Sequence, residues 1–151
     1  MNTQFLHPEQ KFKLVWGAEN VIRQSVVLAD GVDTDDLHDG LYLTPVGDGK
    51  WEIANASAPA YPMLEMKFQY DGKAIGDGVT IARGTVPAVV SEYDYSAGDG
   101  VNFPEAPEKN QKLKVVNGVL APVDMDGSED HLAVAVVEEV YADRIVVTKL
   151  Y

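Results

Sequence analysis

The chain contains no cysteine. Without thiols it forms neither disulfides nor thiolate metal sites, and it has no cysteine nucleophile. Long apolar runs are also missing, because the longest is Leu132–Val137, whereas a membrane-spanning helix needs about 20 apolar residues. The segment Met1–Pro8 has neither the basic nor the apolar region of a secretory signal peptide, so we expect no such signal.

Basic residues are scarce. Twelve Lys and Arg stand against 24 Asp and Glu in 151 residues, which gives a net charge of −12. Binding to nucleic acid or to anionic lipid depends on clustered positive charge. We therefore expect neither a nucleic acid nor a membrane among the partners. The length and the 46% apolar share fit one globular domain with a core of its own.

Glycine-containing turn signals recur along the chain. Asp-Gly occurs at seven places and Asn-Gly at one, residues 117–118. Both pairs tolerate the positive φ that tight hairpin turns require. The short segments between them are rich in Val, Ile, Thr and Tyr, and helical periodicity is weak. This pattern predicts an all-β protein: a single small β-barrel or β-sandwich domain with few or no long helices.

The turn signals divide the chain into expected elements. We expect hairpins that pair 40–45 with 50–54, 112–116 with 119–122, and 131–140 with 144–150. Further strands are expected at 63–70, 79–83 and 86–95, a helical turn at 34–38, and loops at 54–60 and 103–110. The segment 144–150 is apolar on both faces, which predicts a packed layer on one side and a subunit or loop on the other.

The first 28 residues differ in charge from the next stretch of the chain. Their local sum is +1, whereas Asp30–Asp39 holds five Asp in ten positions. Chain termini are loose unless something ties them down, and this segment carries Phe5, Phe12, Leu14, Val15 and Trp16. Residues 1–28 are therefore either an extended N-terminal arm, which contacts a partner or a neighbouring subunit, or a first strand. Residues 29–151 are expected to form the body.

Patterns that would carry chemistry are weak. The acidic segments 30–36 and 124–130 lack the Gly and Glu that a calcium loop of the EF-hand type needs. The three histidines, at positions 7, 38 and 131, have no metal-site spacing. No nucleophile elbow occurs, and no P-loop either. We expect no catalytic, metal or cofactor-binding residues, and a protein that is not an enzyme.

Trp and Tyr side chains allow a carbohydrate hypothesis. Tyr93 and Tyr95 share a strand face, and an exposed row that included Trp51 could stack on sugar rings. Aromatic residues are more often found in cores and at subunit interfaces. Both alternatives remain open.

The order of segments resembles the small β-rich proteins that decorate the capsids of tailed bacteriophages. The resemblance covers residues 39–150 and rests on turn-and-strand patterns. In chain order these are Asp39-Gly40-Leu41-Tyr42-Leu43-Thr44, Gly49-Lys50-Trp51-Glu52-Ile53-Ala54, Val79-Thr80-Ile81-Ala82-Arg83-Gly84, Tyr95-Ser96-Ala97-Gly98-Asp99, Lys114-Val115-Val116-Asn117-Gly118-Val119-Leu120-Ala121-Pro122, Ala133-Val134-Ala135-Val136-Val137-Glu138-Glu139-Val140 and Asp143-Arg144-Ile145-Val146-Val147-Thr148. The sequence departs from the pattern at Ala133-Val134-Ala135, where a Gly is frequent.

This resemblance implies a viral structural protein of the cement type. Such a protein is made in the host cytoplasm and stabilises the virion as a homotrimer on the outer capsid surface. Its partners would be the major capsid protein and two further copies of itself, with shell contacts expected at Phe5, Phe12, Leu14, Val15 and Trp16. The alternatives are a carbohydrate-binding or receptor-binding β-sandwich module of a virion and, less favoured for want of a motif, a nucleotide hydrolase.

Overall fold

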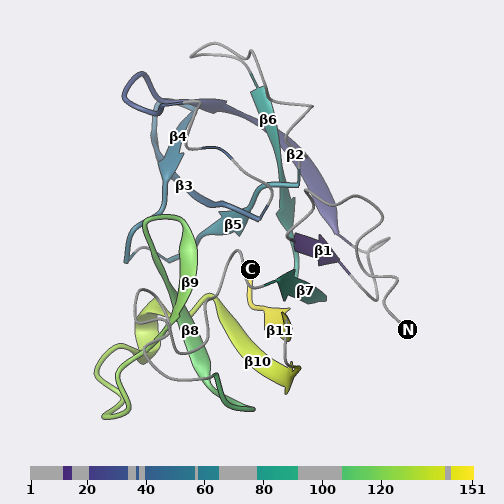
Figure 1. The fold of residues 1–151 in the computed structure, drawn as a ribbon. Coiled ribbons are helices and arrows are strands. Elements are labelled where there is room, and N and C mark those ends of the chain that lie inside the picture. The colour runs from purple at the N-terminus through teal and green to yellow at the C-terminus, as the bar shows by residue number, and fades with distance from the viewer. Residues whose placement is uncertain are drawn as a thin grey trace.

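The computed structural model describes residues 12–14, 21–33, 37, 40–56, 58–64, 78–91, 107–141 and 144–151. In these ranges the chain forms strands β1 to β11 and one short 3-10 helix, η3, with no α-helix (Figure 1). The all-β prediction is confirmed. The helical turn expected at 34–38 lies largely outside the described residues.

Six strands form one antiparallel sheet. Their spatial order is β1 (Phe12–Leu14), β7 (Pro87–Ser91), β11 (Arg144–Lys149), β10 (Ala135–Val140), β8 (Lys112–Val116) and β9 (Val119–Pro122). β11 therefore has a partner strand on each side, and its side chains from Ile145 to Val147 are buried. A strand in the middle of a sheet with a packed face has a nearly continuous apolar run, which explains the two-sided pattern in the sequence.

The other five strands form a second sheet, which curls strongly. Its order is β5 (Tyr61–Pro62), β3 (Tyr42–Gly47), β4 (Lys50–Ile53), β2 (Ile22–Leu28) and β6 (Gly78–Arg83). All neighbours are antiparallel except β2 and β4. The two ends of the sheet meet where Met63 bridges Ile81 and the Leu64 N–H donates to the Thr80 carbonyl at 2.9 Å. This contact is a single bridge and not a ladder, so the described strands make two open sheets.

Each sheet has its own apolar core. One cluster fills the curl of the five-stranded sheet and includes Leu28, Leu43 and Ile81, all fully buried. The other lies on the six-stranded sheet and includes Leu113 and Val147. Tyr151 packs against both clusters, so it joins the two layers.

The tip of the β8–β9 hairpin fastens one sheet to the other. Asn117 and Gly118 have φ values of +49° and +85°, as a type I′ turn requires. The Gly118 N–H donates to the Ala54 carbonyl at 2.7 Å, and the Gly118 carbonyl accepts from the Tyr42 N–H at 2.9 Å. The tip therefore binds the backbone beside β3 and β4 (Figure 1).

Local patterns in the sequence predicted the positions of most of these elements. The hairpins with turns at 48–49 and 117–118 are confirmed. The third hairpin is confirmed over β10 and β11, but its first strand begins at Ala135 and not at residue 131. Asp130–Leu132 form η3 instead, because the Leu132 and Ala133 N–H groups bond backward to the Glu129 and Asp130 carbonyls. The strands expected at 63–70 and 86–95 extend beyond the described residues.

Parts of the first 28 residues belong to the sheets. β1 pairs with β7 at the edge of the six-stranded sheet. β2 lies between β4 and β6 in the other sheet. Both described stretches are thus strands of the body, whereas residues 1–11 and 15–20 lie outside the described ranges.

Candidate functional site

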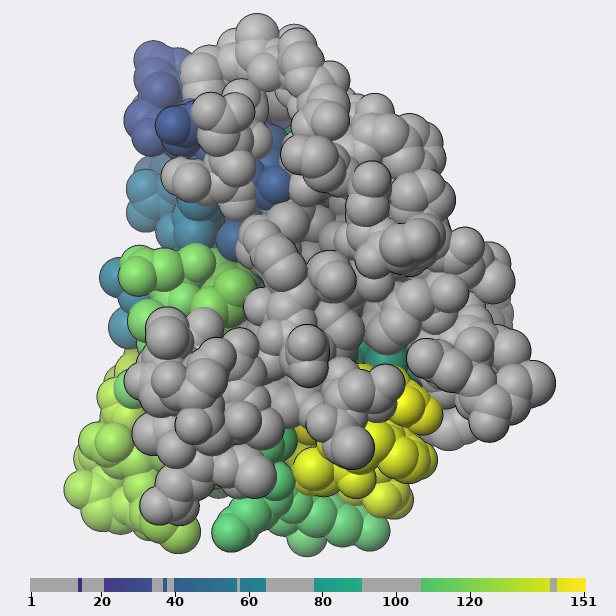
Figure 2. Space-filling model, viewed as in Figure 1, coloured from purple at the N-terminus to yellow at the C-terminus, as the bar shows by residue number. Residues whose placement is uncertain are grey.

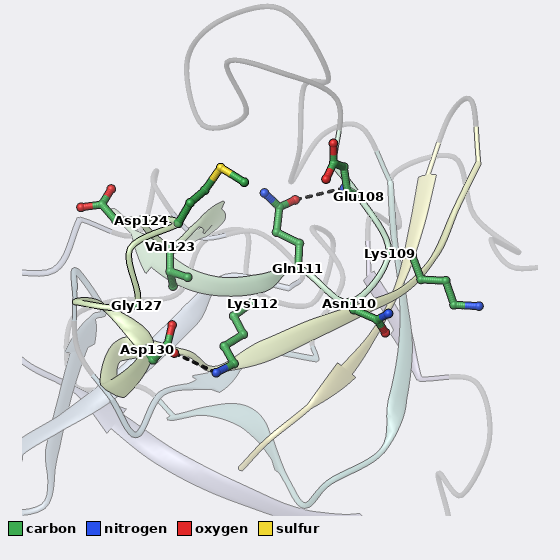
Figure 3. Close-up of a pocket in the computed structure, with 10 residues that line it drawn as sticks. Glu108, Lys109, Asn110, Gln111, Lys112, Val123, Asp124, Gly127 and Asp130 are labelled. Atoms are coloured by element: carbon green, nitrogen blue, oxygen red, sulfur yellow. Dashed lines mark hydrogen bonds and ion pairs between the residues drawn. The ribbon is translucent and has the colours of Figure 1, made fainter.

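An open groove lies where the β8–β9 hairpin ends (Figure 3). It has a volume of about 360 Å³. One wall is the turn Glu108–Gln111 with Lys112 at the start of β8, and the other is the loop of residues 123–130 that comes after β9. We call residues 123–130 the acidic loop. The lining of the groove is polar and mixed in charge, with Val123 and Met125 as the apolar members.

Two lysines of β8 fix the acidic loop. Lys112 and Lys114 are two residues apart on one strand, so their side chains share a face. The Lys114 Nζ donates to both carboxylate oxygens of Glu129, at 2.8 and 2.7 Å. The Lys112 Nζ lies 3.0 Å from the Asp130 Oδ2. The acidic residues therefore neutralise neighbouring lysines and hold the loop against the sheet.

Hydrogen bonds inside the acidic loop complete its shape. The Glu129 Oε1 also accepts from the Asp124 N–H at 2.9 Å. The Asp126 Oδ1 accepts from the Ser128 N–H at 2.8 Å, and Gly127 turns the chain with a φ of +83°. These bonds lower the pKa of both carboxyl groups. The hydrogen bond from Lys114 is the main cause of the lower pKa of Glu129, and the hydrogen bonds from Ser128 are the main cause of the lower pKa of Asp126. Both groups are therefore ionised at neutral pH.

This arrangement suits binding by surface contact. Lys112 and Asp130 of the groove pair with each other, and Gln111 Oε1 accepts from the Glu108 N–H at 3.1 Å. In the part of the chain that the structure describes, no group of three or more His, Asp or Glu residues could hold a metal ion. His131 is exposed on η3, while His7 and His38 lie outside that part.

Replacing Lys114 by methionine is expected to loosen the acidic loop. The change removes the ammonium that binds both oxygens of Glu129, and a charged partner makes such hydrogen bonds strong. We expect amide hydrogen exchange of residues 124–129 to become several-fold faster, while the rest of β8 keeps its protection. Lowering the pH through the depressed pKa of Glu129 should likewise reduce the protection of these amides in the unaltered protein, when their exchange is compared with the intrinsic rate at the same pH.

The control for this experiment is Lys109→Met. Lys109 forms an exposed ion pair with Glu139 at 3.6 Å, outside the acidic loop. The amides of residues 124–129 in Lys109→Met should therefore exchange as fast as those of the unaltered chain. Equal exchange rates in Lys114→Met and Lys109→Met would contradict the fixing role of Lys114.

The residues expected to contact a shell lie only in part within the described ranges. Leu14 is 9% exposed and packs into the core of the six-stranded sheet. Phe12 lies in β1, but its side chain is outside the description, as are Phe5, Val15 and Trp16 entirely. The structure therefore gives Leu14 a role inside this chain and leaves the other four contacts as predictions.

The aromatic residues near the curled sheet form a packed cluster. The Trp51 ring is 7% exposed and lies 5.6 Å from the Tyr61 ring, which is 6.3 Å from that of Tyr151. The Arg83 guanidinium lies over Tyr61, with its Cζ 4.6 Å from the ring centroid. Trp51 is thus a core residue, while Tyr93 and Tyr95 lie outside the described residues.

Sequence reasoning missed one buried cation. Lys149 on β11 is 1% exposed, and its Nζ donates to the carbonyls of Gly84 and Tyr151. Burial disfavours the charged amine and lowers its pKa from 10.5 to about 8. The alternation of β11 could have revealed this residue, since position 149 shares a face with the buried Ile145 and Val147.

Comparisons with known proteins identify no relative. No protein-family model, no curated protein and no solved structure matches the chain. Among the described residues, no helix is long and apolar enough to cross a membrane.

Proposed function

We propose that this chain is a capsid decoration protein of a tailed bacteriophage. It binds, as a homotrimer, the outer surface of the shell built by the major capsid protein, and it stabilises that shell without chemical transformation. The proposal places the protein on the virion.

The main support for the proposal is that the sequence segments that carry the resemblance coincide with strands of the structure. Within the described residues these segments fall on β3, β4, β6, β8, β9, β10 and β11, and the Asn117-Gly118 turn hydrogen-bonds to the backbone beside β3 and β4. The residues that carry the resemblance thus belong to both sheets, whereas β1 and β2 come before the residues that it covers. Fold does not determine function by itself, so the proposal depends on a direct measurement of shell binding.

A protein of this kind acts through contact area and copy number. The acidic loop is a preformed surface feature, because Lys112 and Lys114 fix it before any partner binds, and a fixed loop loses little conformational freedom on binding. Three linked copies multiply a weak single contact through effective concentration. Each trimer would bridge neighbouring capsid subunits and oppose their separation.

The carbohydrate-binding alternative receives no support from Trp51. Its ring is covered by the chain itself, and stacking on a sugar requires an exposed ring face. The described residues thus favour no second function.

The proposal is tested by shell binding. Purified protein is mixed with expanded shells assembled from the major capsid protein of the same genome, and the pellet is assayed after sedimentation. We expect saturable binding at up to three copies per local threefold position and a higher temperature of shell disruption. Shells that sediment without the protein at tens of micromolar would overturn the proposal.

Deleting residues 1–11 is expected to weaken shell binding at least tenfold while leaving the fold intact. This deletion removes Phe5 and retains β1, whose Leu14 belongs to the core. A deletion through residue 16 would remove that buried strand as well and confuse binding with folding. The urea midpoint of the shortened chain serves as the control, and unaltered shell affinity would exclude the N-terminal segment as a contact.

A further inference from the structure

Two apolar side chains are much more exposed than the other large ones in the described part of the molecule. Met125 is 97% exposed and Ile22 is 66% exposed, whereas the next are 47%. Single exposed apolar residues are common on protein surfaces. These two differ from the common case because their nearest charged neighbours along the chain or across the strand pair have opposite signs: Asp124 and Asp126 flank Met125, and Arg83 faces Ile22.

Ile22 lies in a basic patch, which we define as Ile22 and Arg83, because the two residues face each other across the β2–β6 pair and share one face of the sheet. Arg23, the next residue along β2, is exposed and belongs to the opposite face at the same end of the strand. The Arg83 guanidinium donates to the Gln24 Oε1 at 2.6 Å and the Tyr61 hydroxyl at 3.1 Å. Both acceptors are neutral, and within the described residues neither arginine forms an ion pair. The patch therefore retains its positive charge in a chain with a net charge of −12.

Met125 lies at the tip of the acidic loop, between Asp124 and Asp126. The loop is held by Lys114 and Lys112, so Met125 is presented in a fixed position. Its flexible thioether side chain adapts to irregular apolar surfaces. The tip thus combines one apolar side chain with two carboxylates, which is the complement of the basic patch.

The two features lie on opposite sides of the molecule. In Figure 1 the acidic loop is at the lower left, beside β8, and the beginning of β2 is at the right, beside the lower end of β6. In the space-filling view the acidic loop forms part of the lower left margin (Figure 2). They cannot meet within one chain, so their complementarity can be used only between copies.

We infer that the acidic loop of one copy docks onto the basic patch of a second copy, with Met125 against Ile22 and the two aspartates against Arg83. The contact is heterologous, because it joins two different surfaces. Such contacts close into rings when the rotation between copies permits. The inference rests on the proposed function only for the number of copies in the ring, because three such contacts close a homotrimer.

Electrostatic interactions favour this contact over random self-association. Copies that each carry a charge of −12 repel one another. Complementary patches offset this repulsion locally and select one orientation.

The test uses two variants and their mixture. Ile22→Glu places a negative charge in the basic patch, and Met125→Ser removes the apolar side chain at the loop tip. Both positions are exposed, so both variants should fold. By analytical ultracentrifugation we expect each variant alone to associate at least tenfold more weakly than the unaltered chain. Val46→Glu, an exposed site in β3 outside both features, should assemble normally.

Mixing the two variants gives the decisive result. Each retains one intact surface, so a head-to-tail contact predicts dimers of one Ile22→Glu chain with one Met125→Ser chain and no larger species. An unaltered chain that stays monomeric up to millimolar concentration, variants that assemble normally, or a mixture without dimers would each overturn the inference. Variants that assemble normally but fail to sediment with shells would assign these residues to the shell contact instead.

These outcomes are separable from the proposed function. Shell binding by the unaltered protein tests decoration, whereas the mixture tests only the contact between copies.

Discussion

Replacing Gly118 by alanine is expected to lower the free energy of unfolding by about 3 kcal/mol or more. A Cβ at this position would lie 2.3 Å from the Leu41 Cδ1 and 2.9 Å from the Ile53 Cγ2. Leu41 is buried, so any movement of its side chain disturbs the packing around it. Overpacking of this kind costs about 1–3 kcal/mol, and the positive φ of +85° adds about 1–2 kcal/mol for a residue with a Cβ.

The matched control is Gly49→Ala in the β3–β4 turn. Gly49 has a similar φ of +72°, but a Cβ there would meet no atom within 4 Å. It therefore carries the backbone cost without the packing cost, and we expect a loss of only about 1 kcal/mol. Urea denaturation of both variants measures the difference. Equal losses would show that the hairpin tip does not join the two sheets as tightly as its contacts indicate.

The stability of the protein is expected to rise with pH between 8 and 10.5, because Lys149 is buried. The pKa of Lys149 falls from 10.5 to about 8 on folding. Below pH 8 both states carry the charge, and the folded state bears its full desolvation cost. Between the two values the unfolded chain holds a proton that the folded chain has lost, so stability increases with pH. The gain is about 3 kcal/mol over the whole window, and about half of it falls below pH 9.5.

Lys149→Met removes this gain, since methionine fills a similar volume without a titrating group. The free energy of unfolding, measured from pH 7 to 9.5, should rise in the unaltered protein and stay nearly flat in the variant. Lys109→Met provides the comparison, because the Lys109 side chain is 64% exposed and its loss should leave the rise unchanged. Parallel profiles for the unaltered chain and Lys149→Met would contradict the role assigned to burial.

The sequence predicted those parts of the fold that depend on neighbouring residues. The turns at 48–49 and 117–118 were predictable because Asp-Gly and Asn-Gly favour positive φ wherever they occur. The two-sided apolar pattern of β11 likewise indicated a covered strand. Alternation and turn chemistry are local properties, so they locate strands and hairpins without any knowledge of the whole.

Pairings between distant strands could not be predicted in this way. Nothing near β2 indicates that it runs parallel to β4, and nothing near β1 indicates that β7 is its partner. The same limit applies to the candidate surfaces. Arg83 faces Ile22 only because β6 pairs with β2, and the acidic loop is fixed by lysines of another segment. The shell contacts in the N-terminal segment were predicted from its apolar and aromatic composition. Composition does not distinguish a residue that contacts a partner from a core residue such as Leu14.

The central place of β11 has a consequence for biosynthesis. This strand comes after all the others along the chain, yet it separates β7 from β10 in the sheet. While the ribosome still holds residues 144–149, β1 and β7 have no connection to β10, β8 and β9, and their apolar faces stay uncovered. Contacts between distant parts of a chain form slowly, and uncovered strands are prone to aggregation in the interval. The six-stranded sheet therefore completes only after translation has passed residue 149, and until then β7 and β10 lack the strand that lies between them.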